Sequence, residues 1–188
     1  METPNPTAVA NGRLRLGAVI AAAAAVAFLA WIVVRGDNDH GKSSKQPTQA
    51  PPSLASIKDL KELRASVGHP VYWAGRQNQT YELTRTSNGN IYIRYLSSAA
   101  DVGAPRPDFL TVGTYPFKHA QKTLQRLGRK QGQVTKAAPG GGLVVANGSN
   151  AQNAYLAYPD EDFQVEVFDP QPGRALQLAS SGRIRPIP

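Results

Sequence analysis

Apolar residues form one uninterrupted run near the start of the chain and later recur in helical and strand-like patterns. Residues 16–34 are nineteen consecutive uncharged residues, eight of them alanine. As an α-helix this run would span about 28 Å, close to the hydrocarbon thickness of a bilayer. In lipid a helix is the favoured state, because every backbone polar group has to be satisfied within the segment. We therefore predict a single transmembrane helix over 16–34 that acts as an uncleaved signal anchor.

Two features of this run leave alternatives open. Ala25-Val26-Ala27 matches a signal-peptidase pattern, so cleavage is the competing prediction. Cleavage there would leave seven apolar residues, 28–34, at the new N-terminus, which favours the anchor. Gly17 and Ala21 have the spacing of closely packed helices, so a homodimer through this helix is a further alternative.

The flanks of the run determine the predicted topology. Arg13 and Arg15 precede it, and three basic residues follow within eleven positions, so the positive charges nearly balance. Residues 35–53 contain no large apolar side chain, which is typical of a disordered linker. We predict a short cytoplasmic tail over 1–15, a linker over 35–53 and an extracytoplasmic domain over 54–188 of a single-pass cell-membrane protein.

Three segments of 54–188 have helical patterns. Apolar residues recur every third position from Leu54, and Gly68 and a proline follow, which predicts a helix over 54–67 with Ser53 as its N-cap. A second helix is predicted over 116–129, with Pro116 in its first turn. A third is predicted over 173–181.

Strands are predicted where β-rich runs lie between turn residues. These runs are 71–74, 81–86, 91–96, 110–113, 143–146, 154–158 and 163–168, with 183–188 as a further edge strand. Asn88-Gly89 predicts a hairpin between the second and third runs. The fold class is therefore α+β, a mostly antiparallel sheet with about three helices packed on one face.

Two strand triplets lie at a constant offset of 72 residues. Residues 71–75 align with 143–147, and residues 91–95 align with 163–167. This offset predicts a finer arrangement, a duplicated three-stranded meander in which each copy is followed by a helix.

Charge and cysteine usage narrow the function classes. The chain carries 21 Lys and Arg against 13 Asp and Glu, a net charge of +8. Such a surplus favours anionic partners, namely lipid headgroups, an anionic envelope polymer or nucleic acid. The absence of cysteine excludes disulfides, thiolate nucleophiles, cysteine metal sites and a lipidated-cysteine anchor. We expect no cofactor and no metal.

The predicted helix over 116–129 carries the sharpest candidate site. Four basic residues lie within about 80° of arc, opposite the apolar side of the helix. They are Lys118, Lys122, Arg126 and Arg129. We interpret them as a surface for a polyanion or a partner, with a solvated face of an ordinary amphipathic helix as the alternative. The stacking aromatics that favour nucleic acid are absent from this face.

The remaining candidates are weaker. Tyr92 and Arg94 share one face of their strand and form a ligand-stacking patch if no helix covers it; otherwise they are half-buried sheet residues. The acidic residues 160–162 are a calcium-site candidate or a solvated turn. His69 and His119 are the imidazoles of 54–188, and because no catalytic motif surrounds them we name no catalytic residue.

Three short segments of the sequence resemble segments of known proteins. They are Gly68-His69-Pro70-Val71-Tyr72-Trp73-Ala74-Gly75, Val112-Gly113-Thr114-Tyr115-Pro116 and Val165-Glu166-Val167-Phe168-Asp169-Pro170. Residues 54–188 thereby resemble small single-span membrane-anchored proteins of high-GC bacteria, a group to which no activity is assigned. The resemblance implies location and class and carries over no site residue.

We therefore expect a non-enzymatic envelope protein whose outer domain binds a protein partner, an anionic polymer or a lipid headgroup. A small hydrolase-like envelope enzyme and a surface nucleic-acid-binding protein are the open alternatives.

Overall fold

The computed structural model describes residues 47–188. The predicted tail, the transmembrane helix with its Gly17 and Ala21 pair, and the linker up to residue 46 lie outside the described residues. Within 47–188, no helix has the length and apolar character needed to cross a bilayer.

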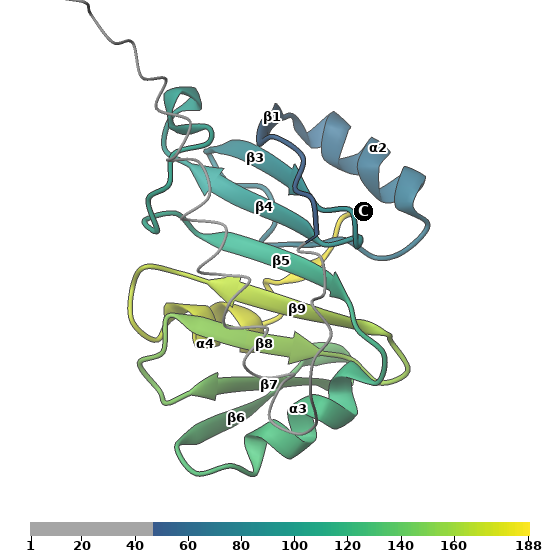
Figure 1. Cartoon of the computed structure of the whole chain (residues 1–188). Coiled ribbons are helices and arrows are strands. Elements are labelled where there is room, and N and C mark those ends of the chain that lie inside the picture. The colour runs from purple at the N-terminus through teal and green to yellow at the C-terminus, as the bar shows by residue number, and fades with distance from the viewer. Residues whose placement is uncertain (1–46) are drawn as a thin grey trace, which may run out of the picture.

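Eight antiparallel strands form one sheet (Figure 1). Across the sheet they are β1 (Ser53–Ala55), β3 (Thr80–Arg85), β4 (Ile91–Leu96), β5 (Thr111–Pro116), β9 (Phe163–Phe168), β8 (Asn153–Ala157), β7 (Gly142–Asn147) and β6 (Gln133–Ala138). A separate ribbon pairs β2 (Tyr72–Trp73) with β10 (Arg185–Pro186). The predicted α+β class with a mostly antiparallel sheet is confirmed.

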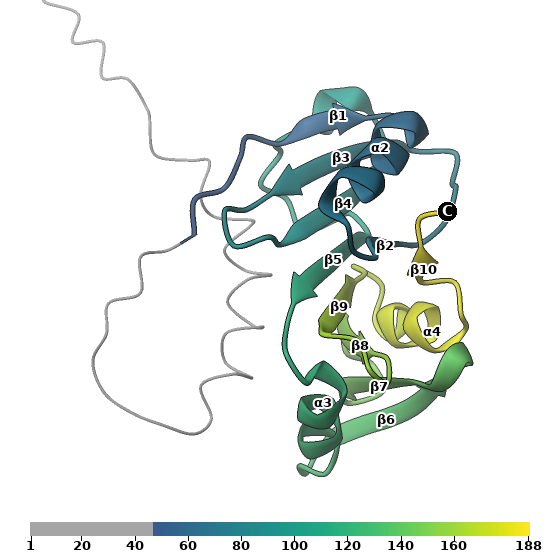
Figure 2. The ribbon, with the colours of Figure 1, turned by 90° about the vertical axis from the view of Figure 1, so that its right-hand side faces the viewer.

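The helices lie on both faces of the sheet, which corrects the prediction of a single helical layer. Figure 2 shows α2 (Ile57–Val67) and α4 (Arg174–Ser180) on one side and α3 (Ala120–Gly128) on the other. The reason is that β7 and β8 are apolar on both faces. Val144 and Leu156 join the main core, whereas Val145 and Tyr155 pack under α3. A strand with two apolar faces needs cover on both.

Helix α2 begins three residues later than its apolar pattern predicts. Ser56, not Ser53, is the N-cap: its Oγ accepts a hydrogen bond from the Asp59 amide at 3.2 Å, and its own amide donates to Asp59 Oδ2 at 2.7 Å. This capping box satisfies two of the free amides of the first turn. Ser53 lies instead in the edge strand β1, which pairs with β3. The last residues of the predicted linker therefore belong to the sheet.

The predicted start of the second helix at Pro116 is wrong. Strand β5 runs through Pro116, and α3 begins at Ala120 after His119 adopts a left-handed conformation with φ 57°. Asp162 holds this turn, because its carbonyl accepts from the Phe117 amide at 2.7 Å and its Oδ1 accepts from the His119 amide at 2.9 Å. The cap comes from a distant part of the chain, so local spacing gives no sign of it.

The first copy of the predicted duplicated meander does not form from the strands predicted for it: β3, β4 and β5 form a meander followed by α3, and the predicted first strand is not part of it. Strand β2 leaves the sheet and pairs with β10, with the Tyr72 amide donating to Thr114 Oγ1 at 3.0 Å and the Ala74 amide donating to the Tyr95 hydroxyl at 2.7 Å. Side-chain oxygens of β4 and β5 thus accept the hydrogen bonds that a neighbouring strand would otherwise accept. These bonds hold the β2 segment beneath β4 and β5. Strands β7, β8 and β9 do form a meander, and α4 follows them.

Candidate functional site

Helix α3 packs close to the outer strands of the sheet. Ala120 and Leu124 are fully buried against residues of β7 and β8. At the other end of the helix, a Cβ on Gly128 would collide with Cγ2 of Thr135 on the edge strand β6. The glycine therefore allows helix and strand to approach closely there, and the opposite side of α3 faces outward.

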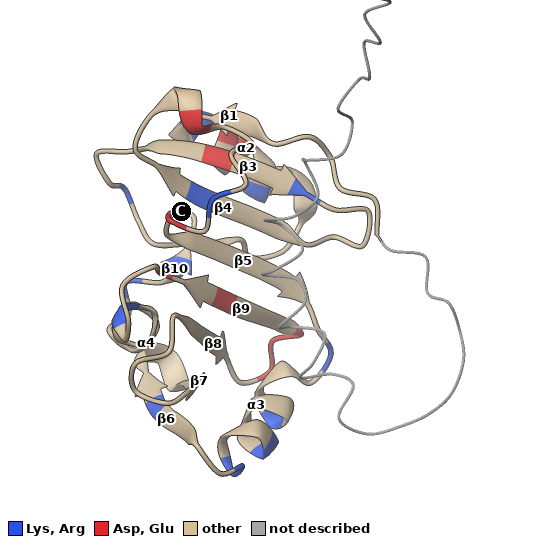
Figure 3. Cartoon of the chain, turned by 60° about the vertical axis from the view of Figure 1, so that its left-hand side comes forward, with Lys and Arg blue, Asp and Glu red and all other residues tan. Residues whose placement is uncertain are grey.

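Five exposed basic residues follow this outward side of α3, and we call them the basic ridge. They are Lys118, Lys122, Arg126, Arg129 and Lys130. Figure 3 shows the basic positions gathered on α3 and the segments beside it. Among residues 47–188, no carboxylate lies within salt-bridge distance of their charged groups. Lys118 precedes the helix, so the turn at His119 separates it from the helical register of the others.

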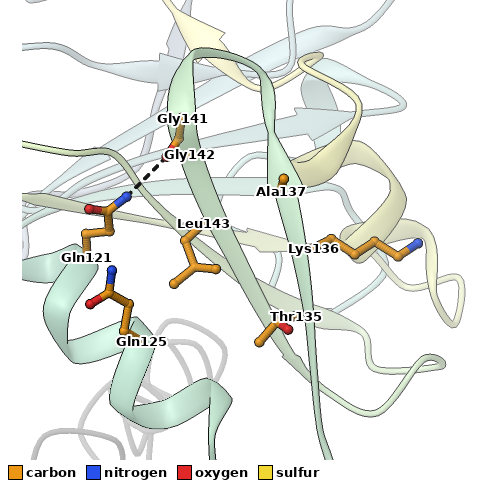
Figure 4. A pocket seen from close by; sticks show the side chains of 8 residues that line it. All are labelled: Gln121, Gln125, Thr135, Lys136, Ala137, Gly141, Gly142 and Leu143. Atoms are coloured by element: carbon orange, nitrogen blue, oxygen red, sulfur yellow. Dashed lines mark hydrogen bonds between the residues drawn. The ribbon is translucent and has the colours of Figure 1, made fainter.

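The whole positive surplus of the domain lies in the segment that contains α3. Residues 54–188 hold sixteen Lys and Arg and ten Asp and Glu, whereas residues 109–159 hold six Lys and Arg and no acidic residue. The rest of 54–188 therefore carries ten charges of each sign. Five of the six unbalanced charges form the basic ridge. The sixth, Lys136 on β6, extends away from α3 (Figure 4).

The acidic residues 160–162 form the turn between β8 and β9, at the start of α3. Asp162 holds the turn before α3 through the His119 amide, and Glu161 Oε2 accepts a hydrogen bond from the Tyr72 hydroxyl at 2.7 Å. Negative charge at this end of α3 also complements the helix dipole. In the part of the chain that the structure describes, no three His, Cys, Asp or Glu residues are grouped closely enough to hold a metal ion.

An open hollow of about 310 Å³, with polar and apolar lining in about equal parts, lies between α3 and the β6–β7 hairpin (Figure 4). Gln121 Nε2 donates to the Gly141 carbonyl oxygen at 3.1 Å and joins the helix to the hairpin turn η2 (Pro139–Gly141). Gln125, Thr135 and Leu143 also line the hollow. This site could not be predicted from the sequence, because no strand was predicted at β6 and the lining residues come from separate elements.

Tyr92 and Arg94 lie on the face predicted for them, but the protein itself surrounds them. Tyr92 is buried, and its ring meets that of Tyr115 edge to face with centroids 5.6 Å apart. Arg94 pairs with Glu82 at 2.8 Å, donates to two carbonyl oxygens of the loop 97–109, and lies over the Phe109 ring. The loop, rather than a helix, covers this end of the sheet face, and the guanidinium group is committed to protein partners.

A buried carboxyl group lies on the same face. Glu166 is 1 % exposed, and its Oε2 accepts a hydrogen bond from the Tyr115 hydroxyl at 2.6 Å. The Tyr115 ring extends over Gly113, where a Cβ would lie 2.7 Å from the hydroxyl oxygen. Burial raises the pKa of Glu166 to about 7, and the hydroxyls of Tyr115 and Tyr155 oppose that rise. Its other oxygen, Oε1, has no hydrogen-bond partner among the described residues.

The two histidines lie outside the hollows of the domain. His69 stacks on Phe163 with ring centroids 4.6 Å apart, and its Nδ1 lies 2.9 Å from the Pro70 carbonyl oxygen. His119 forms the turn before α3. Neither lines the hollow beside α3 or a smaller one of about 140 Å³ near Arg174.

The chain matches no family model, no curated protein and no solved structure.

Proposed function

We propose that the protein is a non-enzymatic, single-span membrane protein of the cell envelope whose extracytoplasmic domain binds an anionic polymer through the basic ridge. One observation carries the proposal. Five of the six unbalanced positive charges of the domain lie along one surface, where no described carboxylate is within salt-bridge distance of them. Unneutralised charges on one face attract a polyanion and release its counterions on binding.

The position of the basic ridge supports a polymer rather than the bilayer that holds the tether. The chain enters the sheet beside β3, where the Ala50 amide donates to the Arg85 carbonyl oxygen at 2.8 Å. Helix α3, along which the basic ridge lies, packs over β7 and β8, near the other edge of the eight strands (Figure 1). At about 4.8 Å per strand, the five or six steps from β1 to these strands amount to about 24–29 Å. A domain that stands on its entry edge would therefore hold the basic ridge away from the membrane.

The surface chemistry disfavours the other candidate partners. Among residues 47–188, Leu54 is the only large hydrophobic residue that is exposed, so the surface offers no apolar patch of the kind that a stable protein interface buries. The segment 118–130 contains no Phe, Tyr or Trp on which bases would stack. The hydrolase alternative lacks a histidine in either hollow.

Binding of the purified full-length chain to linear polyphosphate tests the proposal. The ridge variant K122E/R126E/R129E reverses three charges of the basic ridge and is expected to lose binding at least tenfold. The matched control K58E/K61E/R64E reverses three exposed charges on α2 and alters the net charge equally. For three or four ionic contacts, the logarithm of the binding constant should fall with the logarithm of salt concentration at a slope of about −2 to −3.

Each result of this experiment bears on the proposal. Equal loss in the two variants would assign the effect to net charge and refute a role for the basic ridge. Binding of the wild-type chain to vesicles with anionic lipid, but not to polyphosphate, would replace the polymer by a lipid surface. A wild-type chain that binds neither would end the proposal.

A further inference from the structure

We infer that the hollow between α3 and the β6–β7 hairpin binds the sugar unit of the polymer, so that the ligand is an anionic polysaccharide. This inference rests on the proposed function, because the basic ridge supplies the attraction for the charges. It adds that neutral groups next to the basic ridge select a polymer of sugars over other polyanions.

The hollow and the basic ridge share one side of α3. At 100° per residue, Gln125 lies about 60° around the helix from Lys122 and about 40° from Arg129. A chain that follows the basic ridge would therefore pass directly along the opening of the hollow. Along the helix, Lys122, Arg126 and Arg129 follow one another at about 4.5–6 Å. This spacing suits an extended polysaccharide with one negative charge on each sugar unit.

The lining of the hollow matches a ring with several hydroxyl groups. Gln125 and Thr135 present an amide and a hydroxyl group, both of which donate and accept hydrogen bonds, and Leu143 adds an apolar surface (Figure 4). Lys136 also lines the hollow, but its side chain extends away from Gln125 and Leu143, so its charge does not point at a group bound between them (Figure 4). Ligand sites for small molecules combine an apolar surface with a few placed polar groups, and their volumes begin at about 300 Å³.

The walls of the hollow are set by the fold. At one end the Gln121 amide is bonded to the Gly141 carbonyl oxygen, and at the other Gly128 brings the helix against Thr135. Between these two contacts, the Gln125 amide makes no hydrogen bond to any residue of 47–188 and is exposed. The fold therefore fixes the backbone around the hollow, whereas the free Gln125 amide is available to a ligand and is ordered on binding at an entropic cost.

The test compares two polyanions, one built of sugars and one without sugars; because their charge densities differ, each variant is compared with wild type on the same polymer. Polygalacturonate carries one carboxylate on each sugar ring, and linear polyphosphate carries charge without sugars. The hollow variant Q125A/T135V removes both polar groups, and valine keeps the methyl group that contacts α3 beside Gly128. The control Q177A/T80V makes the same two changes on α4 and β3. All variants are full-length chains measured at one salt concentration.

We expect the wild-type chain to bind polygalacturonate more tightly than polyphosphate. The hollow variant should lose at least tenfold in affinity for polygalacturonate and stay within twofold of wild type for polyphosphate. The control should leave both affinities unchanged.

Failure of this inference differs from failure of the proposed function. If the hollow variant binds polygalacturonate like wild type, or loses affinity for both polymers equally, the hollow is not a sugar site although the basic ridge still binds polyanions. If K122E/R126E/R129E binds both polymers like wild type, the proposed function is wrong. The proposed role of the hollow, which depends on that function, then fails as well.

Discussion

Replacing Glu166 by glutamine is expected to favour the folded domain more above neutral pH than in acid. The carboxyl group is 1 % exposed, and burial raises its pKa from an ordinary value of 4.5 to about 7. Burial disfavours the charged form, so the folded domain holds the proton more tightly than the unfolded chain does.

The sign and size of the effect follow from this difference. Below pH 4.5 the group is protonated in both states and has no pH-dependent effect on the free energy of unfolding. As the pH rises from 4.5 to about 7, the unfolded chain releases the proton first, and stability falls by about 1.4 kcal/mol per pH unit. The loss reaches about 3 kcal/mol and then stays constant. Glutamine cannot ionise, so the variant should escape this loss.

Urea unfolding of the full-length chain in one detergent, followed by tryptophan fluorescence, measures the effect at pH 4 and pH 8. Trp73 is buried and reports on unfolding of the domain. The quantity of interest is the difference between variant and wild type at each pH, because other titrating groups cancel in it. The glutamine amide in place of the unpartnered Oε1 adds a cost that is the same at both values.

The exposed Glu62 on α2 supplies the control, because Glu62→Gln makes the same chemical change at a solvated position. A Glu166→Gln variant whose advantage over wild type does not grow between pH 4 and pH 8 would refute the reasoning. It would show that the carboxyl group ionises as easily in the fold as in the unfolded chain.

Three further substitutions test other contacts by the same urea measurement. Arg94→Ala removes the ion-pair partner of the buried Glu82 carboxylate and should lower the free energy of unfolding by about 3 kcal/mol. The double variant Glu82→Gln/Arg94→Met should recover most of this loss. A single variant as stable as wild type would contradict the importance of the pair. Gly113→Ala places a methyl group against the Tyr115 hydroxyl and should lower the free energy of unfolding by about 1–3 kcal/mol. The loss should be smaller when Tyr115→Leu is also present. A loss that does not depend on residue 115 would point to another cause. Ser56→Ala removes the N-cap of α2 and should cost about 1 kcal/mol, with Ser53→Ala as a control that should cost less.

Local patterns predicted the elements whose causes are local. Asn88-Gly89 marked the β3–β4 hairpin, and the alternation in 91–96 separated the two faces of β4, both as observed. Gly68, with φ 69°, ends α2 as its position after the apolar stripe indicated. In each case the turn residue or the side-chain period alone determines the outcome.

The remaining features depend on partners distant in sequence. Strand β6 has a weak β pattern and is held by its pairing with β7, and the position of β2 outside the sheet depends on hydrogen bonds that its segment donates to side chains of β4 and β5. In the candidate site, too, one part was predictable from a local pattern and the other depends on distant partners. The basic residues were visible as a helical pattern, whereas the hollow required the packing of α3 against β6. Glu166 gave no signal as a buried group, because a carboxylate in a strand is ordinarily expected to face water.

Gly128 does not line the hollow, but it sets the distance between α3 and β6 and therefore the width of the hollow. Because the missing side chain lets α3 lie against Thr135, an alanine there would lift the helix from the edge strand by about the thickness of a methyl group. A substitution at this position can therefore change which ligand the domain prefers while the polar groups that contact the ligand stay the same. A redesign for larger sugar units would start from this helix–strand separation and keep the lining as it is.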